Sequence, residues 1–308
     1  MKKVLLSLVI FMSTTAFAQV FDVASIQKVD APNIGGMVAG ISPKGDYILL
    51  TSDQLSGLMK YDLTSGKTEV LSTAVAAGLN VQFSADGTEV LYREDKFVNK
   101  LRKSAVLHKN WKTGKLTQVA TNCRNLNAMS LQGGKAMAVV NGELATVMSV
   151  GNVGAKSLAS AKTLKPIASS CNGQLVMTVN GVSNIISPNG KQYTYIWSSV
   201  SPDGKKVCYY IGGLGCFVCD INGKNVKSMG NLLAPQWYDN STLVGFNSTD
   251  DGHTATSGCI VAQSISGARQ VLTQDTMIAI FPYASAEGKK IAFSDINGAT
   301  YIINNSAV

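Results

Sequence analysis

Short runs of apolar and β-branched residues recur along this chain, and a tight polar turn precedes each of them. The clearest turn is Ser-Pro-Asp-Gly at residues 201–204, between Val200 and the run Val-Cys-Tyr-Tyr at residues 207–210. Pro and Asp suit the first positions of a β-turn, and Gly supplies the positive φ that closes it. Looser copies lie at residues 41–45, 83–87 and 284–288. The pattern predicts a repeated strand–turn–strand unit.

Weaker copies of the turn extend the series over most of the chain. The residues that close the turns are Gly45, Gly87, Gly134, Gly173, Gly204, Asn240 and Gly288. Their separation averages about 40 residues, which is the length of one four-stranded propeller blade. A second series fits the turns between third and fourth strands, namely Gly66, Gly114, Gly154, Gly190, Gly223 and Gly267. We therefore predict an all-β propeller.

The two ends of the chain decide the number of blades. After Gly288 the sequence has room for two further strands, whereas residues 20–29 form a strand that precedes the first repeat. Pairing these two ends would leave no open sheet edge. We predict seven four-stranded blades, the last of which is closed by the N-terminal strand as its outermost strand. If the weak units at Gly173 and Gly204 formed one blade, the count would fall to six.

These turns resemble the propeller repeats of the TolB-like family, a WD-repeat-like group of periplasmic proteins that is also related to the propellers of prolyl oligopeptidases. The likeness covers nearly all of residues 19–308 and implies a propeller, but it implies no particular activity because this fold has many unrelated functions. TolB has a separate N-terminal α/β domain, and prolyl oligopeptidases have a C-terminal hydrolase domain. We expect neither here and predict a single TolB-like β-propeller domain over residues 19–308.

The first 18 residues have the composition of an export signal. Lys2 and Lys3 precede an apolar stretch at residues 4–12, and the Ala-Phe-Ala sequence at residues 16–18 is typical of a cleavage site. The apolar stretch is shorter than a membrane-spanning helix requires. We predict a signal peptide at residues 1–18 that is cleaved after Ala18. The mature protein is expected in the periplasm or outside the cell, and it is not expected to span the membrane.

Positive charge is concentrated in one segment. The chain has 27 Lys and Arg against 19 Asp and Glu, a formal net charge of +8, and residues 96–115 contain seven of the basic residues and no acidic one. The rest of the chain is close to neutral. Because a nucleic-acid-binding domain usually has a broad basic surface, we expect no nucleic-acid partner.

Residues 96–103 are predicted to form a long loop between the second and third strands of blade two, where other blades have short turns such as Asn180-Gly181. Blocks of like charge are often only solvated, and that is the simpler interpretation of this loop. The alternative is a recognition loop for an acidic envelope protein or an anionic glycan. Its basic groups would steer the partner, and its apolar groups would be buried against it. The candidate binding residues are Phe97, Lys100, Leu101, Arg102 and Lys103.

Three further binding candidates lie outside this loop. Arg124 and Trp197 stand where the inner strands of blades three and five are predicted to begin. His253 lies in the polar loop 248–254. It is either a ligand-binding or cation-binding group or part of a solvated turn, and the abundance of turn formers favours the second interpretation.

Residues typical of catalytic and metal sites are few. The chain has two His, and it has no phosphate-binding glycine loop, zinc-protease motif or serine-hydrolase turn. Six Cys in an exported chain raise the question of disulfides, and Cys208 and Cys219 lie on adjacent predicted strands where they could oppose one another. Cys216 and Cys219 are three residues apart on one strand, so they point to opposite faces and fit a metal poorly. We predict no metal and no cofactor.

Three classes of function remain. We predict a monomeric, non-catalytic propeller that binds or scaffolds a protein, peptide or glycan in the cell envelope. The alternatives are a lactonase-like or lyase-like propeller enzyme with its site at the central channel, and a structural component of an envelope assembly. The residues expected where inner strands begin form no carboxylate cluster, which favours binding; they are Asn33, Asn80, Arg124, Asn125, Trp197 and Gln236.

Overall fold

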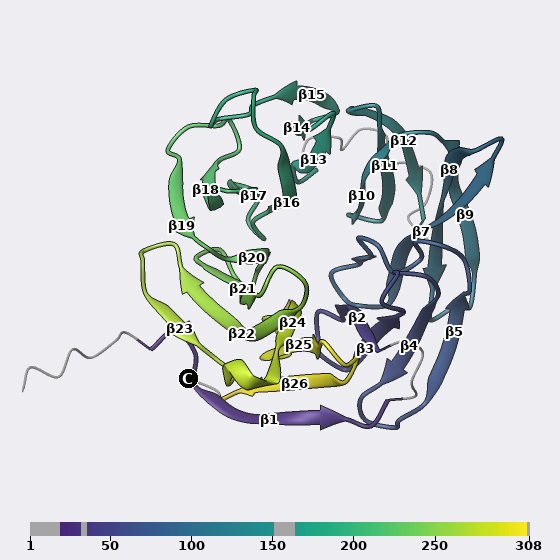
Figure 1. Cartoon of the computed structure of the whole chain (residues 1–308). Coiled ribbons are helices and arrows are strands. Elements are labelled where there is room, and N and C mark those ends of the chain that lie inside the picture. Colours follow the sequence, from purple (N-terminus) through teal and green to yellow (C-terminus); the bar gives the residue numbers. More distant parts are fainter. Residues whose placement is uncertain (1–18, 32–35, 151–163, 307–308) are drawn as a thin grey trace, which may run out of the picture.

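The chain forms seven antiparallel β-sheets that are arranged as blades around a central axis (Figure 1). This computed structural model describes residues 19–31, 36–150 and 164–306. The predicted all-β, seven-bladed propeller is confirmed, and the six-bladed alternative is wrong because the units at Gly173 and Gly204 lie in separate sheets. The predicted signal peptide, residues 1–18, lies outside the described residues.

Blades 1 to 7 follow one another along the chain, and the strands of each blade are named from the axis outward. Blade 1 contains β2 (Met37–Ile41), β3 (Tyr47–Thr51), β4 (Leu58–Asp62) and β5 (Thr68–Ser72). Blade 2 contains β6 (Gln82–Phe83), β7 (Glu89–Val98), β8 (Leu101–Asn110) and β9 (Leu116–Cys123). Blade 3 contains β10 (Leu126–Gln132), β11 (Lys135–Val140) and β12 (Glu143–Ser149), and blade 4 contains β13 (Ile167–Cys171), β14 (Gln174–Val179) and β15 (Val182–Ile185).

The remaining three blades complete the ring. Blade 5 contains β16 (Tyr195–Val200), β17 (Lys206–Ile211), β18 (Gly215–Asp220) and β19 (Lys227–Gly230). Blade 6 contains β20 (Leu233–Trp237), β21 (Thr242–Asp250), β22 (Ala255–Ser264) and β23 (Arg269–Val271). Blade 7 contains β24 (Ala279–Ser285), β25 (Lys290–Asp295), β26 (Thr300–Asn305) and β1 (Val23–Val29).

Two blades depart from the four-stranded prediction, since the described residues of blades 3 and 4 form three strands each. In blade 4, Gly190 was expected between a third and a fourth strand. It instead closes a tight turn in which its N–H bonds to the Ser187 carbonyl at 3.0 Å. Pro188 lies inside that turn and cannot donate to a strand ladder. Gly154, the corresponding glycine of blade 3, lies outside the described residues.

Helix is almost absent from the described part of the chain. The helix found there is a three-residue 3₁₀ turn, η2 (Asp275–Met277). No helix among the residues 19–31, 36–150 and 164–306 is therefore long and apolar enough to cross a membrane.

A serine side chain organises the turn between the first and second strands of several blades. In blade 1 the Ser42 hydroxyl accepts hydrogen bonds from the backbone N–H groups of Asp46 and Tyr47, at 3.1 and 3.3 Å. In blades 2 and 5, Ser84 and Ser201 accept equivalent bonds at 2.9 and 3.0 Å. In all three turns the N–H of the Gly bonds back to the Ser carbonyl. The repeated Ser and Gly therefore close the inner hairpins of blades 1, 2 and 5 in the same way.

Apolar side chains of neighbouring blades pack against one another around the ring. Between blades 2 and 3 the buried cluster joins Leu91 and Val106 of blade 2 to Met129 and Leu131 of blade 3. Alternate residues of a strand share one face. The face of blade 2 that is turned toward blade 3 therefore also carries the polar residues Glu89, Arg93, Asp95, Ser104 and His108.

The ring closes where β1 pairs with β26, as predicted for the N-terminal strand. Figure 1 shows the purple β1 alongside the yellow β26 at the outside of blade 7. A second contact joins the inner turns of blades 7 and 1. The Ser285 hydroxyl and the Gly288 N–H both donate to the Pro43 carbonyl, at 2.7 and 3.2 Å. Strand pairing and turn packing thus both hold the closure.

Replacing Gly288 by Ala tests this turn contact. A Cβ at Gly288 would lie 2.5 Å from the Lys44 carbonyl oxygen, so the two turns would have to separate. We expect Gly288→Ala to lower the free energy of unfolding by about 1–3 kcal/mol. Gly212→Ala is the control, because a Cβ there meets nothing within 4 Å. Denaturant unfolding measures both, and equal stability of the two variants would contradict the packing described.

Candidate functional site

The second and third strands of blade 2 extend past the rest of the sheet as a projecting hairpin (Figure 1). The predicted long loop at residues 96–103 is therefore wrong in form, because β7 and β8 pair without interruption to Val98 and Leu101. Asn99 and Lys100 make the turn with φ of 51° and 63°. Two-residue hairpin turns of this kind need positive φ at both positions, which Asn tolerates well and Lys poorly. The basic insertion is an ordered β-hairpin.

A buried polar cluster holds the base of this hairpin. The Arg93 guanidinium donates to both carboxylate oxygens of Asp95 at 2.8–3.1 Å and to the Ser104 hydroxyl at 2.7 Å. Ser104 donates in turn to Asp95 at 2.6 Å. The side chains of Arg93 and Asp95 are 6% and 3% exposed. Because charges this deeply buried are stable only when paired, the cluster holds the bases of β7 and β8 to one another.

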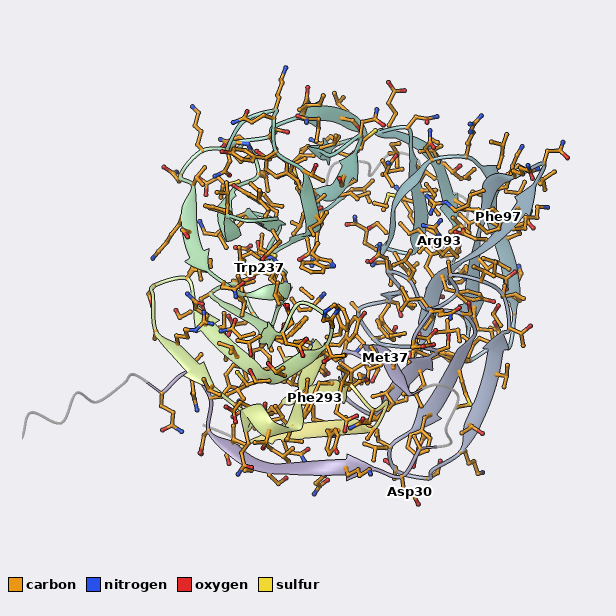
Figure 2. All side chains as sticks on the ribbon, in the orientation of Figure 1. Asp30, Met37, Arg93, Phe97, Trp237 and Phe293 are labelled. Atoms are coloured by element: carbon orange, nitrogen blue, oxygen red, sulfur yellow. The ribbon has the colours of Figure 1, made fainter. Side chains whose placement is uncertain are left out.

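A groove lies under the outer part of the hairpin, next to the connection between β9 and β10. Its volume is about 360 Å³, and its lining residues are Phe97, Lys100, Leu101, Arg102, Arg124 and Asn125. Five of these six are binding residues predicted from the sequence. Asn125 is anchored to blade 3, since its side-chain amide donates to Asn141 Oδ1 at 2.6 Å. Figure 2 shows Phe97 farther from the axis than Arg93.

The groove is electrostatically positive. No acidic side chain lines it, and within the described part of the chain Lys100 and Arg124 form no ion pair. Arg102 has one distant carboxylate, with its Nε 3.8 Å from Asp95 Oδ2, and that carboxylate is already held by Arg93. Phe97 adds an apolar surface, being 65% exposed. The arrangement suits an anionic partner with an apolar group.

Lys103 lies on the other face of the hairpin, because alternate residues of β8 point to opposite sides. It is paired directly across the strands with Lys96. Like charges in this position repel one another and destabilise a hairpin. Lys103 adds to the positive field of the hairpin and does not line the groove.

The structure does not bring the other two predicted residues into this groove. His253 is exposed in the turn between β21 and β22, where Asp251 Oδ1 accepts the N–H groups of His253 and Thr254 at 2.9 and 2.8 Å. These hydrogen bonds lower the pKa of the Asp251 carboxyl, and the one from Thr254 has the larger effect. This geometry is that of a solvated turn.

Trp197 lies on the inner strand β16 and lines a central cavity of about 1360 Å³. Its φ is 50°, its side chain is 40% exposed, and its ring centroid is 5.3 Å from that of Tyr210. Asn80 and Gln236, which were expected near the starts of inner strands, line the same cavity, and Asn33 lies outside the described residues.

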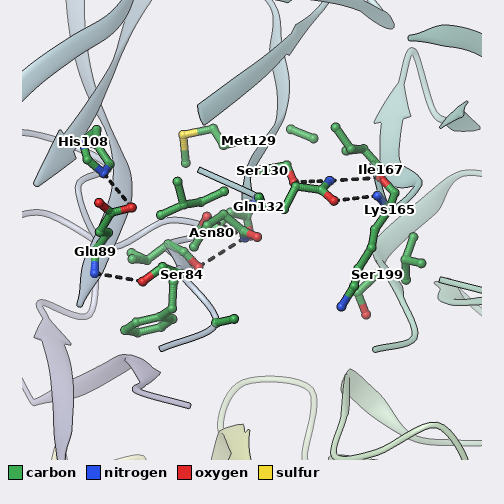
Figure 3. A pocket seen from close by; sticks show the side chains of 18 of the residues that line it. Asn80, Ser84, Glu89, His108, Met129, Ser130, Gln132, Lys165, Ile167 and Ser199 are labelled. Atoms are coloured by element: carbon green, nitrogen blue, oxygen red, sulfur yellow. Dashed lines mark hydrogen bonds and ion pairs between the residues drawn. The ribbon is translucent and has the colours of Figure 1, made fainter. Parts of the chain in front are cut away.

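One polar pair on the wall of the cavity was not predicted. His108 Nε2 lies 3.4 Å from Glu89 Oε2 (Figure 3). Asn110 donates to the other oxygen of Glu89 at 2.7 Å. His108 is 2% exposed, and its Nε2 makes no hydrogen bond of good geometry in the described structure. Glu89 and His108 are far apart in the sequence. Their proximity could have been predicted only from the register of β7 with β8.

The cysteines form no site. Val207 pairs with Cys219 and Cys208 with Val218, so Cys208 and Cys219 point to opposite faces and cannot form the disulfide that the sequence left open. All six Cys are free thiols. Among the described residues no group of three or more His, Cys, Asp or Glu could hold a metal ion.

Comparisons with known proteins support the fold. No protein-family model matches the sequence, and no curated protein matches it with significance. The structure of U3-55K aligns with a TM-score of 0.63 at 8% identity, over 92% of this chain and 99% of that one. TolB from Acinetobacter baumannii aligns at 0.46 and 14% identity, over 92% of this chain and 54% of TolB, so this chain spans about half of that protein.

An oligogalacturonate lyase from Vibrio parahaemolyticus also aligns at 0.46 and 14% identity, over 86% of this chain and 76% of the lyase. The β-propeller that the repeats predicted is thus confirmed at the level of the fold. A propeller fold by itself does not specify a function. Function has to be argued from the site.

Removing Asp95 tests the buried cluster. Asp95→Ala would leave the Arg93 guanidinium buried without its carboxylate, and we expect a loss of about 3–5 kcal/mol in the free energy of unfolding. Asp53→Ala is the control, since Asp53 is exposed, and it should change stability by less than about 0.5 kcal/mol. Similar unfolding curves for both variants would show that the cluster does not hold the hairpin.

Thiol titration tests the cysteine assignment. Burial raises the pKa of Cys208 to about 11 and that of Cys219 to about 12. Because the thiolate is the reactive form, these two thiols should resist a disulfide reagent near neutral pH in the folded protein and react only as the pH rises toward those values. After unfolding, all six thiols should react. A lower number in the unfolded protein would reveal a disulfide.

Proposed function

We propose that this protein is a non-catalytic β-propeller of the cell envelope that binds or scaffolds a protein partner through the groove of the β7–β8 hairpin. One observation supports this above the others. Around the exposed ring of Phe97 the groove gathers Lys100, Arg102 and Arg124, and the carboxylate nearest to Arg102 is already held by Arg93. Exposed aromatic and Arg side chains at a pocket are typical of residues that contribute most to protein interfaces.

The rigid base of the hairpin supports the same proposal. A surface that is ordered before binding loses less conformational entropy when a partner arrives. The Arg93–Asp95–Ser104 cluster provides such order within a structure whose outer cations remain exposed. A basic segment that was only solvated would not need a buried ion pair beneath it.

The cellular setting of the proposal comes from the sequence. The export signal at residues 1–18 would place the mature, monomeric protein in the periplasm or outside the cell. An acidic surface of an envelope protein is then the partner that the groove fits. An anionic glycan of the envelope is the alternative partner, and it has the same charge requirement.

A propeller enzyme is the second candidate function, and the Glu89–His108 pair is the observation that favours it. A carboxylate beside an imidazole on a cavity wall can take part in proton transfer. Among the described residues, however, no Ser, Thr or Cys donates to His108 as a nucleophile would. Turnover of lactones or esters by the purified protein, lost in Glu89→Gln, would favour the enzyme over the binding protein.

Neutralising the hairpin tests the proposed function. The triple variant Lys100→Ser, Arg102→Ser, Lys103→Ser should lose partner capture from an envelope extract, while its melting temperature stays close to that of the unmodified protein. The control is Lys67→Ser, Lys191→Ser, Lys224→Ser. It removes the same charge from exposed positions outside the groove. Capture by the unmodified protein should also weaken with added salt, because salt screens exposed charges.

Two outcomes would contradict the proposal. Unchanged capture by the hairpin variant would exclude the groove as the binding surface. Equal loss of capture in both triple variants would show that net charge alone, and not this surface, attracts the partner.

A further inference from the structure

Strand β9 does not cover the whole edge of its neighbour β8. The last pair between β8 and β9 is Ser104 with Cys123, whereas β8 begins at Leu101. The register of β9 shifts just before this point, and Asn122 has a φ of 56°. A shift of this kind with a left-handed residue bends a strand away from its neighbour. Residues 101–103 of β8 therefore have a strand on one side only.

The backbone groups at this open edge point outward. The N–H of Asp95 donates to the Val75 carbonyl at 2.9 Å, so the polar backbone groups of Asp95 face away from β8. In an antiparallel pair such outward-facing positions recur at every second residue. The next outward pair is Phe97 with Arg102. The N–H and C=O of Arg102 thus face the position that β9 has left, and no backbone partner among the described residues fills it.

The same open position is the basic groove. Phe97 and Arg102 lie directly across the strands from one another on one face, and Arg124 and Asn125 also line the groove. Three cations and no carboxylate line this space. A guanidinium group binds a carboxylate through two parallel hydrogen bonds, which makes Arg better suited than Lys to hold one acidic side chain.

We propose that the groove binds an extended acidic segment of the partner protein as an added β-strand along the β8 edge, with one of its carboxylates between Arg102 and Arg124. This inference rests on the proposed function and names the chemistry of the partner. The strand would continue the line of β9, exchange backbone hydrogen bonds with Arg102 and lay an apolar side chain on Phe97. Strand addition to an open edge is a general mode of peptide recognition.

Two other occupants fit this edge less well. An anionic glycan would satisfy the guanidinium groups but has no regular row of amide N–H and C=O groups for the strand edge. A second copy of this chain would bring one basic hairpin against another, and like charges would oppose the contact. Both are outcomes that the experiment distinguishes.

Three probes of equal charge separate these cases. The first is an eight-residue peptide of alternating Glu and Val, the second is the same peptide N-methylated at every residue, and the third is a four-residue oligouronate. Binding to the full-length mature protein is followed by calorimetry at low salt. We expect the unmodified peptide to bind at least about tenfold more tightly than either of the other two, because only it can pair as a strand.

Two variants and one local measurement locate the peptide. Arg124→Gln should weaken peptide binding at least about tenfold. Lys96→Gln, which removes the same charge from the opposite face of the hairpin, should weaken it less than about threefold. Bound peptide should also slow hydrogen exchange at the Arg102 amide, since strand addition would cover that N–H. A purely electrostatic contact would leave its exchange unchanged.

Several results would overturn the inference. They are equal binding of the N-methylated peptide or the oligouronate, equal losses in Arg124→Gln and Lys96→Gln, unprotected Arg102, and no peptide binding at millimolar concentration. A dimer of the protein that the peptide cannot disrupt would also overturn it. None of these results decides the proposed function, which stands or falls on partner capture by the hairpin triple variant.

Discussion

The hydrogen bonds between β1 and β26 turn a row of sheets into a ring, and the other blades depend on that closure. In the described structure the blades bury their apolar faces against their neighbours, so an open row would expose one face at each end. Joining residues from opposite ends of the chain carries a large loop-closure cost in entropy. Packing between the turns of blades 1 and 7 and the loss of two open sheet edges offset it.

The sequence predicted those parts of the fold that depend on local chemistry. Turn geometry is encoded within five residues, since one Ser and one Gly supply the bonds that close the inner hairpins of blades 1, 2 and 5. This is why blade number and the location of the closing strand were predicted correctly. The prediction of a fourth strand in blade 4 was wrong. Gly190 has the same local sequence pattern as the glycines that do close turns between strands, but Pro188 ends strand pairing before it. Glycine alone cannot distinguish these cases.

The candidate site was likewise predicted from the sequence only in part. The basic segment that forms the hairpin was identified from composition, because a block of cations mixed with apolar residues can be recognised without knowing how the strands pair. Arg124 was chosen for its place at the start of an inner strand. The Arg93–Asp95–Ser104 cluster and the Glu89–His108 pair were missed. Arg93 and Asp95 share a face of β7, but Ser104 and His108 reach their partners from β8, and a shift of one residue in register would turn them to the opposite face. Contacts of this kind can be predicted only when the register between the strands is known.

The buried cluster under the hairpin also has a kinetic consequence. A surface held in one arrangement does not have to wait for a rare conformation, so the rate of encounter is set by diffusion and by the long-range field of the cations. In the proposed complex, the lifetime would be set by short-range contacts at Phe97 and Arg102, which line the groove. Rate and lifetime would thus be controlled by different side chains of one hairpin, and each could change without the other.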